Sequence, residues 1–117
     1  MAGNNGPKIV RSGLQLHLDA ADRKSYPGSG TTWFDLSGNS RHGTLLNGPV
    51  FNSGNGGYIS FDGVDDYVNI PNATNLNNLG SQDFTVSMWV YRATNPPSGN
   101  GEMLYQSATL DNGFVKL

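Results

Sequence analysis

The chain has 117 residues, a net charge of −2, no cysteine and only 14% charged residues. This length suits one domain with a modest core, and the lack of cysteine excludes a disulfide scaffold and zinc–thiolate sites. The seven Lys and Arg residues are scattered, which argues against nucleic acid as a partner because phosphate binding needs clustered basic residues. No apolar run approaches the ~20 residues that cross a bilayer, so we expect no membrane insertion.

The chain begins with the polar, glycine-bearing string MAGNNGP. Residues 1–12 are therefore expected to form a flexible N-terminal arm, followed by a single domain at 13–117. Within that domain Leu14, Leu16 and Leu18 alternate with polar neighbours. A period of two predicts a half-buried strand.

Two turn signals stand in the middle of the chain. Asn47-Gly48 separates the short apolar runs 44–46 and 50–51, a pattern typical of a hairpin; the proline that follows would assign this hairpin to a sheet edge. Residues 58–71 read YISFDGVDDYVNIP. Their alternation predicts two short strands around an acidic, glycine-bearing turn.

The best strand signal is FTVSMWVY at 84–91, where apolar side chains alternate with Thr, Ser, Trp and Tyr. Two further strands are expected at 103–106 and 114–117. We find no internal repeat and no helix of ordinary length. Many short strands separated by Gly- and Asn-rich turns predict an all-β fold, an antiparallel β-sandwich.

The order of these motifs resembles the laminin G-like branch of the concanavalin A-like sandwiches. The resemblance runs from about Gly13 to about Tyr91 and rests on the strings GLQLHLDA, SYPGSGTTWFDLSGN, GTLLNGP, FDGVDDYV and FTVSMWV. These sequence strings are similar to those of modules in bacteriophage virion proteins and in secreted bacterial surface proteins. The resemblance implies a jelly-roll sandwich. A complete laminin G-like domain is longer than this chain, which implies a shortened sandwich, a truncated one, or one completed by partner subunits.

The acidic turn suggests a calcium site, because calcium takes six to eight oxygens from carboxylates, amides and carbonyls. Laminin G-like and pentraxin-like relatives often bind calcium at a loop rim, as the resemblance implies. The candidate ligands are Asp62, Asp65, Asp66 and Asn69. The alternative is that Asp62 and Asp65 only cap turns by accepting backbone N–H groups. No other cofactor is expected.

Flat aromatic rings stack on sugar faces, so Trp33, Tyr67 and Trp89 are the candidate glycan-binding residues, with core packing as the alternative for each. Catalysis is not expected. Glycanases of the resembled superfamily carry closely spaced glutamates, whereas this chain has a single glutamate, Glu102. Neither histidine lies near a nucleophile-elbow motif.

These features predict a non-enzymatic structural module of a virion, as a decoration, fibre or tail component made in the host cytoplasm. Its partners would be other virion proteins or copies of itself. The alternative is a lectin-like module for host attachment, located outside the cell or on its surface, which binds a cell-surface glycan with or without calcium. Both functions occur on the resembled fold, so the fold alone does not choose between them.

Overall fold

The computed structural model describes residues 9–71 and 83–93 with their side chains, and residues 113–116 by their backbone. Its regular elements are short: β1 Thr32–Trp33, β2 Gly43–Leu46, β3 Val50–Asn52, the 3-10 turn η1 Gly54–Gly56, β4 Tyr58–Ser60, β5 Tyr67–Asn69 and β6 Gly113–Lys116. Within these described ranges, no helix has the length and apolar character needed to span a membrane.

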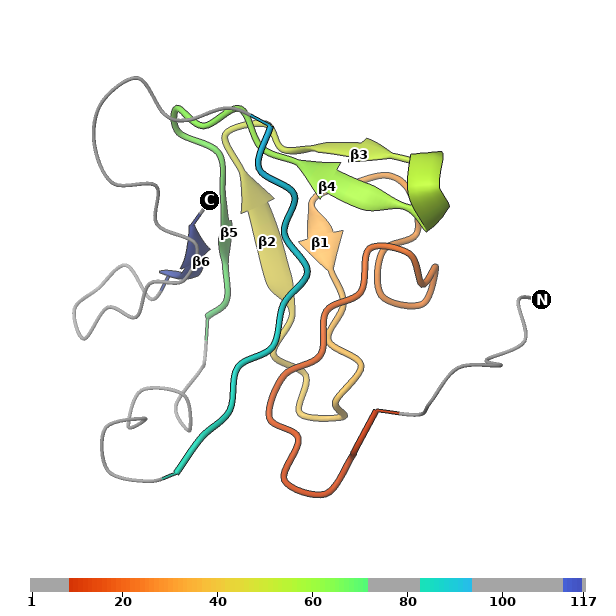
Figure 1. Ribbon diagram of the computed structural model, residues 1–117, viewed down its shortest axis with the longest axis vertical. Helices are drawn as coiled ribbons and strands as arrows, with labels where there is room; N and C mark the ends of the chain where they lie inside the picture. Colours follow the sequence, from red (N-terminus) through yellow and green to blue (C-terminus); the bar gives the residue numbers. More distant parts are fainter. Residues whose placement is uncertain (1–8, 72–82, 94–112, 117) are drawn as a thin grey trace.

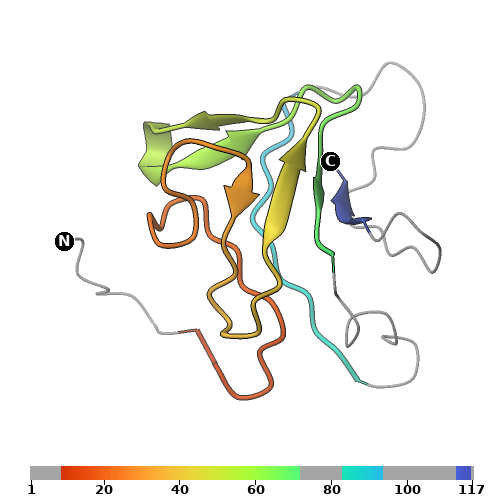
Figure 2. The ribbon, with the colours of Figure 1, turned by 180° about the vertical axis from the view of Figure 1, so that it is seen from behind.

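All strand pairs are antiparallel. One sheet has the order β1-β2-β5-β6, and a second, two-stranded sheet is formed by β3 and β4 (Figure 1). The extended segments 14–18 and 83–93 run on the same side of the larger sheet, in front of it in Figure 1 and behind it in Figure 2. The prediction of an antiparallel all-β fold is confirmed, as are the two strands expected within 58–71.

The hairpin predicted at Asn47-Gly48 is wrong, because β2 and β3 belong to different sheets. Both turn residues have positive φ, 69° at Asn47 and 117° at Gly48, and this left-handed backbone redirects the chain from one sheet to the other. The side-chain amide of Asn47 donates to the carbonyl oxygen of Asp65 at 2.8 Å. Asn47-Gly48 therefore does form a turn, but the turn connects the two sheets. The Asn47 side chain links it by a hydrogen bond to the β4–β5 connection.

The core lies on one face of the larger sheet. Its register pairs Leu45 with Val68 and Trp33 with Gly43, so these residues point to the same side. The buried hydrophobic residues are Tyr26, Leu45, Val68 and Ile70, and six partly buried ones pack against them: Leu16, Leu18, Trp33, Phe51, Ile59 and Phe61. Phe51 and Ile59 are cross-strand partners in the smaller sheet, which therefore covers part of the core.

The strand predicted at 14–18 is not formed, although Leu16 and Leu18 do pack on the core. The segment is held by hydrogen bonds outside any ladder. The N–H of His17 donates to the carboxylate of Asp35 at 2.9 Å, and the carbonyl of His17 accepts from the N–H of Leu36 at 2.8 Å. The alternation of leucines correctly predicts that Leu16 and Leu18 face the core, but it does not predict the partner of the backbone.

Asp35 is the buried polar centre of this region. Its carboxylate accepts the N–H groups of His17, Ser37 and Arg41 and the Ser37 hydroxyl. Arg41, also buried, donates from its guanidinium to the carbonyl and side-chain oxygens of Gln15. Burial raises the pKa of Asp35, but the Ser37 hydroxyl and the three backbone N–H groups together lower it further than burial raises it, so the net shift is downward.

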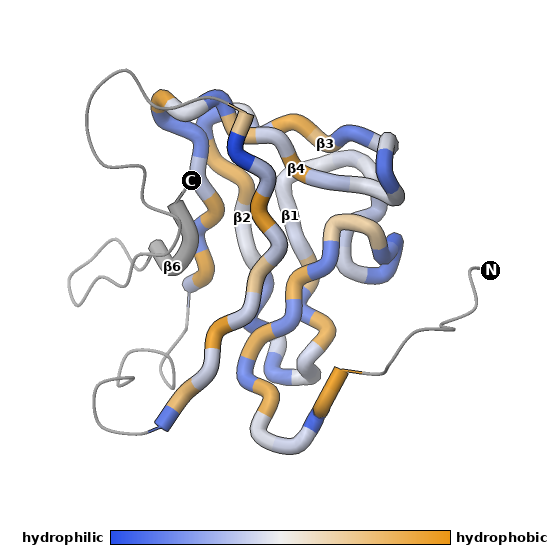
Figure 3. The backbone as a smooth tube through the Cα atoms, in the orientation of Figure 1, coloured by the Kyte–Doolittle hydropathy of each residue, from blue (hydrophilic) through white to orange (hydrophobic). Residues whose placement is uncertain are grey.

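The prediction of a strand at 84–91 is also wrong. Residues 83–93 are extended but belong to no ladder among the described strands. The exposed fraction of the side chains still differs between the two sets. Phe84, Val86, Met88 and Val90 are 41–56% exposed, whereas Trp89 and Tyr91 are 101% and 91% exposed. Figure 3 shows apolar residues recurring along this segment.

Of the two strands expected near the C-terminus, the second is present as β6, Gly113–Lys116. The strand expected at 103–106 lies outside the described residues. In the expected N-terminal arm, residues 9–12 are exposed, and 1–8 lie outside the described part of the chain.

Candidate functional site

The β4–β5 connection is built by its own aspartates. Asp62 Oδ1 accepts the N–H groups of Val64 at 2.8 Å, Asp65 at 3.3 Å and Asp66 at 3.4 Å. Asp66 Oδ2 in turn accepts the N–H of Asp62 at 2.9 Å. This geometry is the turn-capping alternative for Asp62, while the second cap comes from Asp66 and not from Asp65.

The same turn gathers negative charge. Oxygens of Asp62, Asp65 and Asp66 lie within 4.8 Å of one another, with Asp66 buried and the other two exposed. The N–H of Val64 has the largest effect on the pKa of Asp62 and lowers it. Desolvation is the next largest effect and raises the pKa, but the backbone N–H groups of Asp65, Asp66 and Asp62 itself lower it further, so the net shift is downward. Asp62 is therefore ionised at neutral pH, and the cluster offers oxygens that would suit a hard cation.

Asn69, the fourth predicted calcium ligand, belongs to the sheet. It lies on β5 opposite Thr44, beyond the end of the turn. Its Oδ1 is buried without a hydrogen-bond partner among the described residues. The structure thus brings together the three aspartates of the predicted set and assigns Asn69 to the neighbouring strand.

The predicted glycan-binding aromatics are not gathered into one platform. Trp33 is half-buried on the core face, and Tyr67 is half-buried on the opposite face, since it pairs with Leu46. Trp33 packs against the buried core cluster. Trp89 is fully exposed on the segment 83–93 and is the one member of the set with an open ring.

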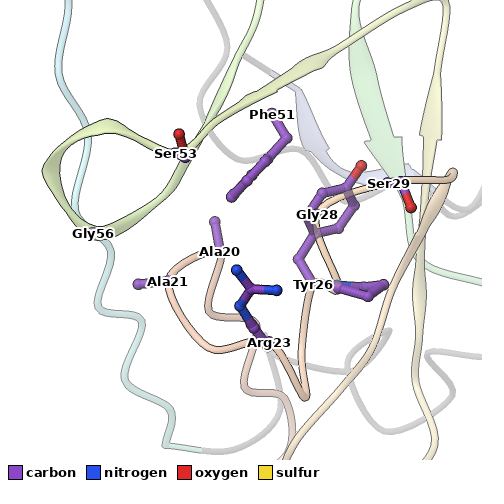
Figure 4. A pocket seen from close by; sticks show the side chains of 10 residues that line it. Ala20, Ala21, Arg23, Tyr26, Gly28, Ser29, Phe51, Ser53 and Gly56 are labelled. Carbon is purple, nitrogen blue, oxygen red and sulfur yellow. The ribbon is translucent and has the colours of Figure 1, made fainter. Parts of the chain in front are cut away.

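A hollow of about 380 Å³ lies between the loop 20–29 and the β3–η1 region (Figure 4). The rings of Tyr26 and Phe51 meet on its inner side, with centroids 5.1 Å apart, and the Tyr26 hydroxyl donates to the carbonyl of Gly30 at 2.7 Å. The Arg23 guanidinium points into the hollow in Figure 4. Sequence reasoning missed this feature, because its aromatic walls come from positions far apart in the chain.

Comparisons with protein-family models, with curated proteins and with solved structures found no match.

Proposed function

We propose that this protein is a non-enzymatic structural module of a virion, a decoration, fibre or tail component that assembles through a concanavalin A-like β-sandwich. The resemblance of the motifs supports the virion context. The observation that carries the assembly role is the segment 83–93, which is extended, rich in apolar side chains, exposed along its whole length and without a strand partner among the described residues.

An extended segment of this kind is ready to bind another strand. A backbone outside a ladder offers N–H and C=O groups to an added strand, which gives affinity through main-chain hydrogen bonds. The side chains add apolar area, since Phe84, Val86, Met88 and Val90 are each about half exposed. Contiguous exposed apolar surface of this kind marks interaction sites.

We take a second copy of the chain as the occupant. Asp83 and Arg92 are the only charged residues of the segment, and they lie at opposite ends of it. Two copies paired antiparallel would bring Asp83 of each near Arg92 of the other, while the uncharged residues between them face one another. A segment with this charge pattern is complementary to itself in the antiparallel direction.

The substitution Ser87→Pro tests the pairing. Ser87 is exposed in the middle of the segment, and proline removes the N–H that a partner strand would use. Because the segment has no ladder to lose among the described strands, we expect Ser87→Pro to keep the melting temperature within a few degrees and to lower the association constant at least about tenfold. That factor corresponds to the loss of one or two inter-strand hydrogen bonds.

Ser87→Ala is the matched control and should assemble as the wild type does. Sedimentation or light scattering over a concentration series measures both variants. Equal assembly of the proline and alanine variants would contradict strand pairing at this segment.

A second candidate is a glycan-binding attachment module that uses calcium. The fully exposed Trp89 ring favours it, because an open indole can stack on a sugar face. In this candidate calcium would neutralise the Asp62, Asp65 and Asp66 carboxylates. Enzyme activity is not part of either proposal.

The calcium hypothesis predicts different effects for two aspartates. Wild-type protein should melt at a higher temperature in calcium than in chelator, because a ligand that binds only the folded state stabilises it. Asp65→Ala should remove that difference and leave the melting temperature in chelator unchanged, since the Asp65 carboxylate is exposed. Asp62→Ala should lower the melting temperature even in chelator, because it deletes the acceptor of three N–H groups.

Differential scanning fluorimetry of the three proteins measures these shifts. An identical melting temperature of the wild type in calcium and in chelator would exclude the calcium site, while the loss on Asp62→Ala would still report the turn cap.

A further inference from the structure

Two Asn-Gly pairs lie in the described residues, Asn47-Gly48 and Asn55-Gly56. Both asparagines are exposed and have positive φ, 69° and 51°. Asparagine followed by glycine is open to an internal reaction, because glycine has no Cβ to keep its amide nitrogen away from the asparagine Cγ. The two pairs therefore share their covalent chemistry and differ only in their surroundings.

Within the described part of the chain, the side chain of Asn47 has a hydrogen-bond partner and that of Asn55 has none. The Asn47 amide nitrogen donates to the Asp65 carbonyl at 2.8 Å, so its rotation requires breaking that bond. Asn55 lies within η1, where the hydrogen bond of the turn runs from the N–H of Gly57 to the carbonyl of Gly54 at 2.9 Å. Among the described residues, no hydrogen bond holds the side-chain amide of Asn55, which lies on the exposed turn.

We propose that Asn55-Gly56 is a site of spontaneous backbone modification. The Gly56 nitrogen attacks Asn55 Cγ, and the new C–N bond replaces the bond to the amide nitrogen, which leaves as ammonia with the proton from Gly56. The product is a five-membered succinimide. Water then adds to either ring carbonyl and opens the ring to aspartate or to isoaspartate, without any oxidant, reductant or enzyme.

Modification at this position affects packing as well as charge. Isoaspartate inserts one extra carbon into the backbone of a three-residue turn. The next residue, Gly57, sits so close to the loop at Ala20 that a Cβ on it would lie 2.8 Å from the Ala20 carbonyl oxygen. Gly56 itself lines the hollow. A displaced turn must therefore withdraw from the Ala20–Ala21 loop and open the hollow.

Peptide mapping by mass spectrometry after prolonged incubation in mildly alkaline buffer tests the proposal. In the folded protein Asn55 should be converted about fivefold faster than Asn47, the factor by which one hydrogen bond of ordinary net strength reduces the population of the freed side chain. In denaturant the two rates should become similar. Equal rates in the folded protein, or no conversion at Asn55, would overturn the proposal.

Two variants distinguish the effect of modification at Asn55 from other changes that occur during incubation. Asn55→Gln should remove the conversion at this turn, because the longer side chain forms the corresponding ring far more slowly. The melting temperature of the wild type should fall during incubation, whereas that of Asn55→Gln should not. Asn47→Gln is the matched control, and its melting temperature should fall during incubation by as much as that of the wild type. A loss of the same size in Asn55→Gln would contradict the proposed consequence for packing.

Discussion

Replacing Asp35 by alanine is expected to lower the free energy of unfolding by about 3 kcal/mol or more, because a buried N–H left without an acceptor costs about 1–3 kcal/mol. The carboxylate accepts the N–H groups of His17, Ser37 and Arg41. Their loss would detach the segment 14–18, and with it Leu16 and Leu18, from the core. Urea unfolding followed by tryptophan fluorescence measures the change.

Asp35→Asn is the control, because one side-chain oxygen remains to accept from His17 and Ser37. It should cost less than alanine does. The pKa of Asp35 is lowered in the fold, so the stability that the charged carboxylate adds is present above its unfolded pKa of about 3.9 and is lost as pH falls through the folded pKa. The advantage of wild type over Asp35→Asn should therefore shrink below about pH 4. An advantage that persists in acid would contradict this explanation.

Gly43→Ala is the second change with a large expected effect. A Cβ at this position would lie 2.7 Å from Cγ1 of Val68, which is fully buried. Val68 is β-branched, so its χ1 rotamer is restricted and its side chain cannot easily move away. The backbone of the sheet must therefore shift. Overpacking of this kind costs about 1–3 kcal/mol, measured as the change in the free energy of unfolding.

Two further variants make this test specific. Val68→Ala alone should cost about 2 kcal/mol by leaving a cavity, but in combination with Gly43→Ala it makes room for the new methyl group. The double variant should therefore be more stable than the sum of the single effects predicts, because neighbouring sites couple. Gly54→Ala is the matched control, since the nearest atom to its Cβ would lie 4.0 Å away, and it should be close to neutral. Additive effects at positions 43 and 68 would contradict the packing argument.

Local sequence patterns predicted side-chain burial better than backbone pairing. The alternation in 58–71 located β4 and β5, with Val68 and Ile70 buried. Leu16 and Leu18 pack on the core as predicted, yet the backbone of His17 between them bonds to Asp35 and Leu36 and not to a strand. A period of two reports which side chains face inward, but it carries no information on which segment lies beside it.

The turn signals failed in the same way. Asn47-Gly48 does adopt positive φ, but β2 pairs with the more distant β5, and β3 pairs with β4, the strand that follows it. At the candidate site, the sequence located the three clustered aspartates. It did not reveal that Asp66 is the buried one or that Asp62 caps the turn, because both depend on how the backbone curls between the two sheets.

The measurement that decides most is the mass of the protein in solution, determined by light scattering over a concentration series for the wild type, Ser87→Pro and Ser87→Ala. Assembly through the segment 83–93 predicts a defined oligomer for the wild type and Ser87→Ala. For Ser87→Pro it predicts a mass closer to that of the monomer at the same concentrations, with a melting temperature within a few degrees of the wild type. A wild type that stays a well-folded monomer at every concentration would contradict assembly between copies of this chain and would leave glycan binding through Trp89 as the better explanation.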